Sequence, residues 1–363
     1  MRQDKQAVVP GREWVRMTSI DLLWKPVEGY IDTASYGLPS IGTMQAVEQA
    51  LSEWQSGQGV WEQWSTSTES ARASFAKLVN TESSSVTIGA ASSQLIGMIA
   101  NSLPRKAVVV VPDIEFTSNL FPWMVAEDHG VVVRAVPLEY LNETVAQGCD
   151  LVATSAVQSA TGEVVDLTSL RTAAESVGAL TVVDATQAAG WYPIDASQHD
   201  AVVCSGYKWL CSPRGVAYMT LSERLAATLE PSAAGWYAGE VIKDSYYGPP
   251  LRLAKDGRRF DISPAWFSWV GGAAANNDLL TIGIEEIYRH NVYLANRLLV
   301  ELDMQPTDSA IVSLKINSSV DPAKVPFRAS LRGGGLRISF HIYNDENDLD
   351  RAASFLKGSI VRS

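Results

Sequence analysis

The chain has 363 residues, of which 46% are hydrophobic and 19% charged, and this balance excludes a disordered protein. Its formal net charge of -11 argues against electrostatic binding of nucleic acid or of anionic lipid, so we expect neither partner.

The sequence shows neither the pattern of a targeting signal nor that of a metal site. The N-terminus begins Met1-Arg-Gln-Asp-Lys-Gln, and charges interrupt its first apolar stretch too early for a signal peptide. No uninterrupted apolar run approaches membrane-spanning length. The three cysteines form no Cys-x-x-Cys pair and the four histidines are scattered, so neither a disulfide framework nor a metal site is expected. These observations favour a cytoplasmic protein without a metal.

The first third of the chain predicts a loop followed by helices. Residues 30–39 indicate a short strand that runs into a tight turn. Residues 42–55 carry an apolar stripe at helical spacing, and residues 70–80 also indicate a helix. The stripe consists of Met44, Val47, Leu51 and Trp54.

Residues 86–94 have the pattern of an anion site. A strand, a turn of small residues and the start of a helix follow one another, and the turn contains Ala91, Ser92 and Ser93. Free backbone amides and the helix dipole both favour an anion at such a place. The alternative is an ordinary capped helix that binds nothing.

Strands and helices then alternate, as in a parallel α/β sheet. Residues 107–111 form a strand by their β-branched content, and Phe116 follows in the next loop. Another buried strand begins at Leu151 and leads to the polar residues Gln158 and Ser159. A crossover helix over residues 166–177 completes the alternation.

The stretch 180–215 carries most of the functional information. Two short apolar runs, 180–183 and 201–204, each lead into polar residues and turn formers, which is typical of buried parallel strands that open into a site. Asp184 and Lys208 follow these runs and can reach one crevice from neighbouring strands. Pyridoxal phosphate requires an amine that holds its aldehyde as a Schiff base and a carboxylate beside its pyridine nitrogen.

Each of these two residues also has an ordinary explanation. Asp184 suits a helix cap, and Lys208 suits a solvated lysine whose stem lies along Trp209. Together, on successive strands, they meet both demands of the cofactor.

The pattern Asp184-x-x-Gln187 followed by Ser205-x-x-Lys208 resembles the class V aminotransferase group of fold-type I pyridoxal phosphate enzymes. The resemblance implies that Lys208 carries pyridoxal 5'-phosphate, Asp184 pairs with the pyridinium nitrogen, Gln187 contacts the phenolic oxygen and Ser205 binds the phosphate. Tyr207 stands where other members have histidine and is similar to the phosphate-binding tyrosine of the kynureninase branch.

The same resemblance extends from Tyr30 to about Leu356 and implies further contacts. It places the cofactor phosphate at Ala91, Ser92 and Ser93 and at Trp236. It places the aromatic ring of Phe116 against the pyridine ring, where cysteine desulfurases have histidine. The family places an asparagine near Gln158 and Ser159, and the sequence does not decide which of the two replaces it. Arg337 resembles the arginine that binds the substrate carboxylate.

The resemblance also implies the overall architecture. We expect an α/β fold of the fold-type I transferase class, with a large domain built on a mostly parallel, seven-stranded-type sheet and a smaller α+β C-terminal domain. The predicted divisions are an N-terminal segment 1–29 that packs on the small domain, a large domain 30–250, and a linker with the small domain, 251–363. Residues 333–335 are three glycines, which favour a hairpin turn over a dinucleotide loop.

The sequence limits the chemistry without selecting one reaction. A cysteine desulfurase needs a nucleophilic cysteine before the carboxylate-binding arginine, and no cysteine lies between Thr307 and Arg337. We therefore expect a homodimeric enzyme that acts on an amino acid or a derivative, with Lys208 as general base, by transamination or carbon-sulfur β-lysis. Epimerisation of the isopenicillin N epimerase type and a non-catalytic role stay open. A nicotinamide oxidoreductase is disfavoured because Gly-x-Gly-x-x-Gly is absent.

Overall fold

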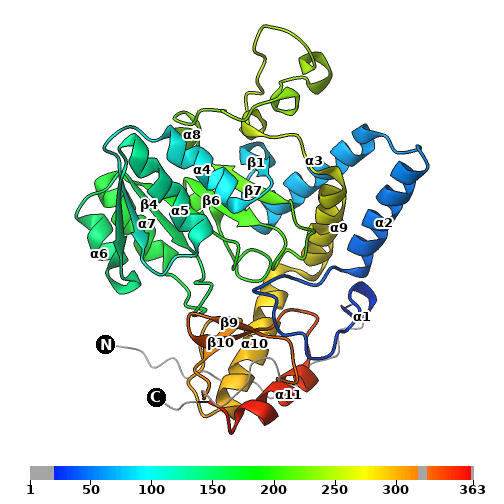
Figure 1. The fold of residues 1–363 in the computed structure, drawn as a ribbon, viewed down its shortest axis with the longest axis vertical. Coiled ribbons are helices and arrows are strands. Elements are labelled where there is room, and N and C mark those ends of the chain that lie inside the picture. The colour runs from blue at the N-terminus through cyan, green and yellow to red at the C-terminus, as the bar shows by residue number, and fades with distance from the viewer. Residues whose placement is uncertain (1–19, 318–324, 361–363) are drawn as a thin grey trace.

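A computed structural model describes residues 20–317 and 325–360. It shows a large α/β unit around a seven-stranded sheet and a smaller unit around a three-stranded sheet, which lies below the large one in Figure 1. The expected N-terminal segment 1–29 lies largely outside the described residues. Its last residue, Gly29, donates a backbone hydrogen bond to Asp348 in the small unit at 2.7 Å.

The large sheet has the strand order β1-β7-β6-β5-β4-β2-β3. Strands β2 to β6 pair in parallel, whereas β7 runs antiparallel to both β1 and β6. The strands are β1 Val86–Gly89, β2 Val108–Pro112, β3 Val132–Val136, β4 Leu151–Ser155, β5 Leu180–Asp184, β6 Ala201–Ser205 and β7 Ala217–Leu221. The expected mostly parallel sheet is confirmed.

Alternate residues of each central strand pack on opposite faces. Val109 and Leu151 contact the core under helices α4 and α5, whereas Val110 and Val152 contact the core under α6 and α7. Because both faces are covered, these strands are mostly apolar up to their carboxyl ends, as the sequence predicted. These helices are α4 Ser92–Ser102, α5 Thr117–Ala126, α6 Leu141–Ala146 and α7 Leu167–Val177.

The β1 end of the sheet is covered by long helices. Phe75 of α3 stacks on Tyr218 of β7 with ring centroids 4.1 Å apart, and Trp269 of α9 contacts the same tyrosine edge-on. The remaining helices of the large unit are α1 Ile20–Leu23, α2 Ile41–Gln55, α3 Trp61–Leu78, α8 Glu223–Ala226 and α9 Trp266–Ile282. The helix expected over 70–80 is thus the second half of a longer helix.

The apolar stripe of α2 is largely exposed within this chain, and only Val47 is half-buried against α9. Met44 is 44% exposed, Leu51 41% and Trp54 62%, although α2 itself packs on α9. Helical spacing therefore identified the helix correctly, but it did not tell which partner covers the stripe.

The small unit combines helix α10, Ile284–Glu301, and helix α11, Glu346–Leu356, with an antiparallel sheet of order β8-β10-β9. Its strands are β8 Ile311–Leu314, β9 Ser330–Arg332 and β10 Gly335–Ser339. Gly333 and Gly334 have φ angles of 54° and 80°, the left-handed conformation that a tight hairpin turn requires. The expected turn at the glycine triplet is confirmed.

Candidate active site

The carboxyl ends of β4, β5 and β6 open into one narrow cavity. Asp184 ends β5 and is 5% exposed, and Lys208 follows β6 and is 6% exposed. Because β5 and β6 are parallel neighbours, both side chains reach the same space. The lining residues are Ser92, Phe116, Ser118, Ser155, Ser159, Asp184, Thr186, Gln187, Ser205, Tyr207 and Lys208.

Burial changes the chemistry of the Lys208 amine. It lowers the pKa of Lys208 to about 8, the nearby carboxylate of Asp184 opposes this change, and the positive charge of Arg337 adds to it. The amine lies 5.3 Å from the ring centroid of Phe116 and 5.8 Å from that of Tyr207. A neutral amine is the nucleophilic form, and a pKa of about 8 makes this form more available near neutral pH than it is in a solvated lysine.

The carboxyl group of Asp184 is prepared for a cationic partner. Burial raises the pKa of Asp184, the hydrogen bond that the Thr186 amide donates at 2.8 Å lowers it, and the charge of Glu115 raises it again. A buried carboxylate of this kind is stabilised by a positive group placed beside it.

Glu115 is a buried carboxylate whose importance was not recognised from the sequence. It is 6% exposed and accepts hydrogen bonds from the Ser155 amide at 2.7 Å, the Ser155 hydroxyl at 2.6 Å and the Asn119 amide group at 3.0 Å. Gln158 also donates to it at 2.8 Å. The amide group of Gln158 is therefore engaged beneath the cavity, and Gln158 does not line it.

Gln187 and Ser159 form one hydrogen-bonded pair on the cavity wall. The Gln187 amide donates to the Ser159 hydroxyl and to the Ala34 carbonyl, each at 3.0 Å, and its oxygen accepts from the Trp209 indole at 2.8 Å. Of the two alternatives that the sequence left open, Ser159 lines the cavity. Contact of either residue with a cofactor stays a prediction.

Three hydroxyl groups gather at the N-terminus of α4. Ser92 and Ser205 hydroxyls lie 2.6 Å apart, Ser92 and Thr186 hydroxyls 3.0 Å apart, and the Ser92 amide donates to the Ser205 hydroxyl at 3.0 Å. The N-cap residue of this helix, Ala91, forms no side-chain capping hydrogen bond. Hydroxyls and amides at the positive end of a helix suit a phosphate. Ala91 is half-buried and Ser93 exposed, and neither lines the cavity.

The aromatic residues that the sequence singled out lie in two places. Phe116 and Tyr207 line the cavity, and the exposed Arg214 lies over the Tyr207 ring at 4.8 Å. Trp236 packs instead against Trp61, with centroids 5.2 Å apart, and does not line the cavity of its own chain.

Arg337 reaches the cavity region from β10 of the small unit. It is 1% exposed, and its Nη1 donates to the Ser159 carbonyl at 2.7 Å and to the Ser159 hydroxyl at 3.1 Å. Its Nη2 donates to the Ser35 hydroxyl at 2.8 Å and lies 3.7 Å from Asp32. Burial lowers the pKa of Arg337 to about 10, which Asp32 opposes. Its buried Nε has no hydrogen-bond partner in the described part of the chain.

Two glycines hold the backbone turn that carries Lys208. A Cβ atom at Gly37 would lie 2.0 Å from the Lys208 carbonyl oxygen, and one at Gly190 would lie 2.4 Å from the Trp209 carbonyl oxygen. The Gly37 amide also donates to the Tyr207 carbonyl at 3.0 Å. Only glycine allows both neighbouring segments to approach this turn so closely.

Pyridoxal 5'-phosphate fits the residues present. The cavity offers an amine of lowered pKa, a buried carboxylate and an aromatic ring, together with hydroxyls at a helix N-terminus. The Asp184 carboxylate would gain a cationic partner in the pyridinium group. The hydroxyl cluster, at the positive end of the α4 dipole, would gain an anionic partner in the phosphate.

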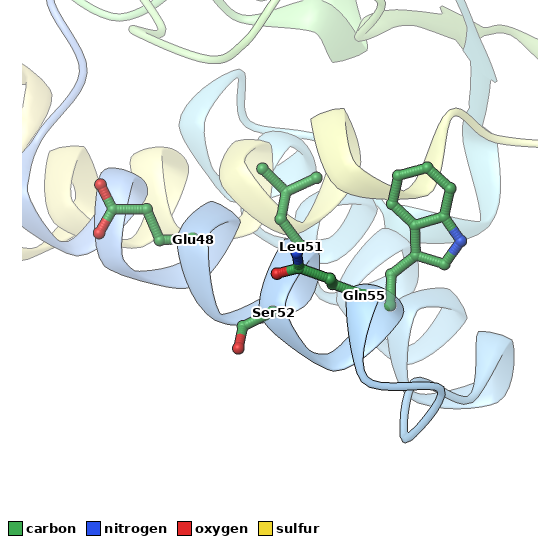
Figure 2. Close-up of a pocket in the computed structure, with 5 residues that line it drawn as sticks. Glu48, Leu51, Ser52 and Gln55 are labelled. Atoms are coloured by element: carbon green, nitrogen blue, oxygen red, sulfur yellow. The ribbon is translucent and has the colours of Figure 1, made fainter.

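Other features of the described residues indicate no second centre. They contain no group of three or more histidine, cysteine or acidic side chains that could hold a metal. Another hollow lies along α2, where Glu48, Leu51, Ser52, Trp54 and Gln55 line it (Figure 2). It contains no nucleophilic amine or thiol. In residues 20–317 and 325–360, no helix is long and apolar enough to cross a membrane.

One family model and several known proteins are similar to this chain in sequence. The family model Aminotransferase class-V matches residues 44–320. An uncharacterised aminotransferase of Bacillus subtilis, YcbU, is 31% identical over 240 residues, which span 63% of this chain and 63% of the relative. An isopenicillin N epimerase of Streptomyces clavuligerus is 27% identical over 79% of this chain and 83% of its own. A probable cysteine desulfurase of Methanothermobacter thermautotrophicus is 27% identical over 74% of this chain and 71% of its own.

The solved structures show the fold. A cystine C-S lyase in complex with cysteine persulfide has a TM-score of 0.82 at 18% identity, over 92% of this chain and 98% of the lyase. A variant of that lyase, with glycine covalently linked to its pyridoxal phosphate cofactor, has a TM-score of 0.81 at 17% identity, over 92% of this chain and 97% of the variant. The expected fold-type I architecture is confirmed.

Replacement of Gly37 by alanine tests whether the turn geometry matters for the site. The added methyl would displace the Lys208 carbonyl, so we expect the dissociation constant for pyridoxal phosphate to rise roughly tenfold or more. Absorbance titration of the apoenzyme measures it. Gly97→Ala is the matched control, because, apart from the backbone of its own helix and its chain neighbours, no described atom lies within 4 Å of its added Cβ. Equal affinities of the two variants would show that the contact at Gly37 does not position the lysine.

Proposed function

The chain belongs to the class V aminotransferase family, and we propose that it catalyses a pyridoxal-phosphate-dependent reaction at the α carbon of an amino acid, by transamination or carbon-sulfur β-elimination. The observation that carries this proposal is the buried, low-pKa amine of Lys208 beside Asp184 in a cavity that Arg337 approaches. The family match confirms the family predicted from the Asp184-x-x-Gln187 and Ser205-x-x-Lys208 motifs.

Each cavity residue has a proposed task in holding the cofactor. Lys208 would hold the aldehyde carbon covalently, and Asp184 would pair with the pyridine nitrogen. The hydroxyls of Ser92, Thr186 and Ser205 bind the phosphate. When bound, the cofactor supplies an electron sink that stabilises negative charge at the substrate α carbon.

Phe116 and the pair Gln187 and Ser159 complete the proposed cofactor site. Phe116 offers a ring face that can stack without exchanging protons. Gln187 and Ser159 are polar groups whose hydrogen bonds to Trp209 and Arg337 fix their orientation, and we place them near the phenolic oxygen.

Lys208 and Arg337 carry the proposed chemistry on the substrate. The Lys208 amine, once free of the cofactor, accepts the proton from the substrate α carbon, and its lowered pKa of about 8 makes the neutral form available at lower pH than in a solvated lysine. Arg337 binds the substrate carboxylate, because a guanidinium group matches a carboxylate with two parallel donors. Ser159, Ser35 and Asp32 already fix the orientation of this guanidinium.

We propose that the chain is not a cysteine desulfurase, although desulfurases are among its relatives. No cysteine lies between Thr307 and Arg337. Cys204 and Cys211 are both 1% exposed, and burial raises the pKa of each thiol, which disfavours the nucleophilic thiolate.

Epimerisation is the second candidate function. The similarity to an isopenicillin N epimerase over 79% of this chain favours it. An epimerase would return the proton to the α carbon instead of releasing a keto acid, pyruvate or sulfide. The identity of the product therefore separates the two proposals.

A homodimer is the proposed assembly. Exposed apolar side chains lie on α2 and on residues 241–251, which belong to the yellow-green segment at the top of Figure 1. In this segment Tyr247 is 90% exposed and Leu251 82%. A second copy of the chain would cover such surfaces.

An amino-acid panel tests the proposed function. We expect the purified protein to absorb in the near visible and to convert at least one amino acid to a keto acid, to pyruvate with sulfide, or to its enantiomer. Arg337→Ala should raise the KM about 100-fold by removing the carboxylate partner, while the near-visible absorbance is retained. A colourless protein inert towards the panel would favour the non-catalytic alternative.

The pH dependence of cofactor capture tests the state of Lys208. Below about pH 8 its amine is protonated and cannot attack, and above that pH it is neutral. The rate at which the apoenzyme captures pyridoxal phosphate, followed by stopped-flow absorbance, should therefore rise up to about pH 8 and then level off. A rate that rises steadily to pH 10, as for a solvated lysine, would contradict this state of the amine.

A further inference from the structure

The β9–β10 hairpin places a second arginine beside Arg337. Arg332 pairs with Gly335, and Ser330 pairs with Arg337. Residues directly opposite each other, and residues two apart along a strand, share one face of a sheet. Arg332 therefore lies on the same sheet face as Arg337, one diagonal step towards the hairpin turn.

This hairpin lies against the wall of the Lys208 cavity. A Cβ at Gly333 would lie 3.2 Å from the Cβ of Ala160, and Ala160 follows Ser159, which lines the cavity and binds Arg337. Burial is the main cause of the lowered pKa of both Lys208 and Arg337, and the positive charge of Arg332 lowers each pKa a little further. Its electric field therefore reaches the reacting amine as well as the proposed carboxylate site.

The guanidinium of Arg332 is available for a ligand. The side chain is exposed, it donates to the Leu331 carbonyl at 2.7 Å, and no carboxylate among residues 20–317 and 325–360 forms an ion pair with it. Arg337 itself retains a buried Nε without a partner in the same residues. In a chain of net charge -11, two neighbouring arginines on a hairpin beside the cavity wall favour binding of an anionic ligand.

The cofactor phosphate does not account for Arg332. The hydroxyl cluster proposed to bind that phosphate is formed by α4, β6 and the residues after β5. Arg332 comes from the small unit, on the side of Arg337. Its position therefore suits a group that binds the part of a substrate that lies away from the proposed phosphate site.

We infer that Arg332 is a specificity-determining residue that binds an anionic side chain, so that the substrates are amino acids with a side-chain carboxylate or a similar acid. Arg337 binds the α-carboxylate, and Arg332 binds the second negative group. This inference rests on the proposed function, because it assigns the substrate class of the same site.

The test compares acids with their uncharged isosteres on the holoenzyme. For the parent enzyme we expect kcat/KM for L-aspartate and L-glutamate to exceed that for L-asparagine and L-glutamine about tenfold, the effect of one charge-assisted contact. Arg332→Ala should bring this ratio close to one, and Arg332→Glu should invert it. Arg134→Ala, which removes an exposed arginine from strand β3 at the far edge of the sheet, should leave the ratio unchanged.

A binding measurement separates recognition from turnover. Calorimetry should show that glutarate binds the parent holoenzyme about tenfold more tightly than butyrate, and that Arg332→Ala loses this difference. Circular dichroism verifies that the variants are folded.

Two outcomes would overturn the inference. If neutral and acidic isosteres react and bind equally well, or if Arg332→Ala keeps the preference, Arg332 does not select the substrate, while the proposed function stands. If no amino acid reacts and no carboxylate binds, the proposed function fails and this inference fails with it.

Discussion

The burial of one amine beside one carboxylate, at the ends of two adjacent parallel strands, is the constraint on which the rest of the site depends. Lys208 and Asp184 are both more than nine-tenths buried. The charge of Asp184 raises the pKa of Lys208, and the charge of Lys208 lowers the pKa of Asp184. Two such groups are costly to bury without further partners, and a bound cation or aldehyde would relieve that cost. The apolar strands β5 and β6 hold the pair in place because both of their faces are packed.

The small unit completes the site through a few shared hydrogen bonds. The Ser159 hydroxyl accepts hydrogen bonds from Gln187 on the proposed cofactor side and from Arg337 on the proposed substrate side. The Gly37 amide, in the segment after Asp32, donates a hydrogen bond to the Tyr207 carbonyl in the turn that carries Lys208. Movement of the small unit would therefore alter the cavity on both sides, because Ser159 is hydrogen-bonded both to Gln187 on the cavity wall and to Arg337.

The sequence predicted what short-range patterns determine. Apolar runs that end in polar residues located β4, β5 and β6, and the glycine triplet located the β9–β10 turn. Patterns along the chain did not identify the roles of Glu115 and Thr186, since these depend on donors brought from other elements by the fold. For the same reason helical spacing identified α2 without showing that Trp54 stays exposed. Trp236 packs on Trp61 within its own chain, and its contact with a cofactor stays a prediction.

The most direct measurement is to find which atom of the chain binds the cofactor. Borohydride reduction of the purified holoenzyme, followed by proteolysis and mass spectrometry, fixes the cofactor to the lysine that holds it. We predict a single pyridoxyl group on the peptide that contains Lys208. A pyridoxyl group on another lysine, or none in a protein that carries the cofactor, would contradict the account.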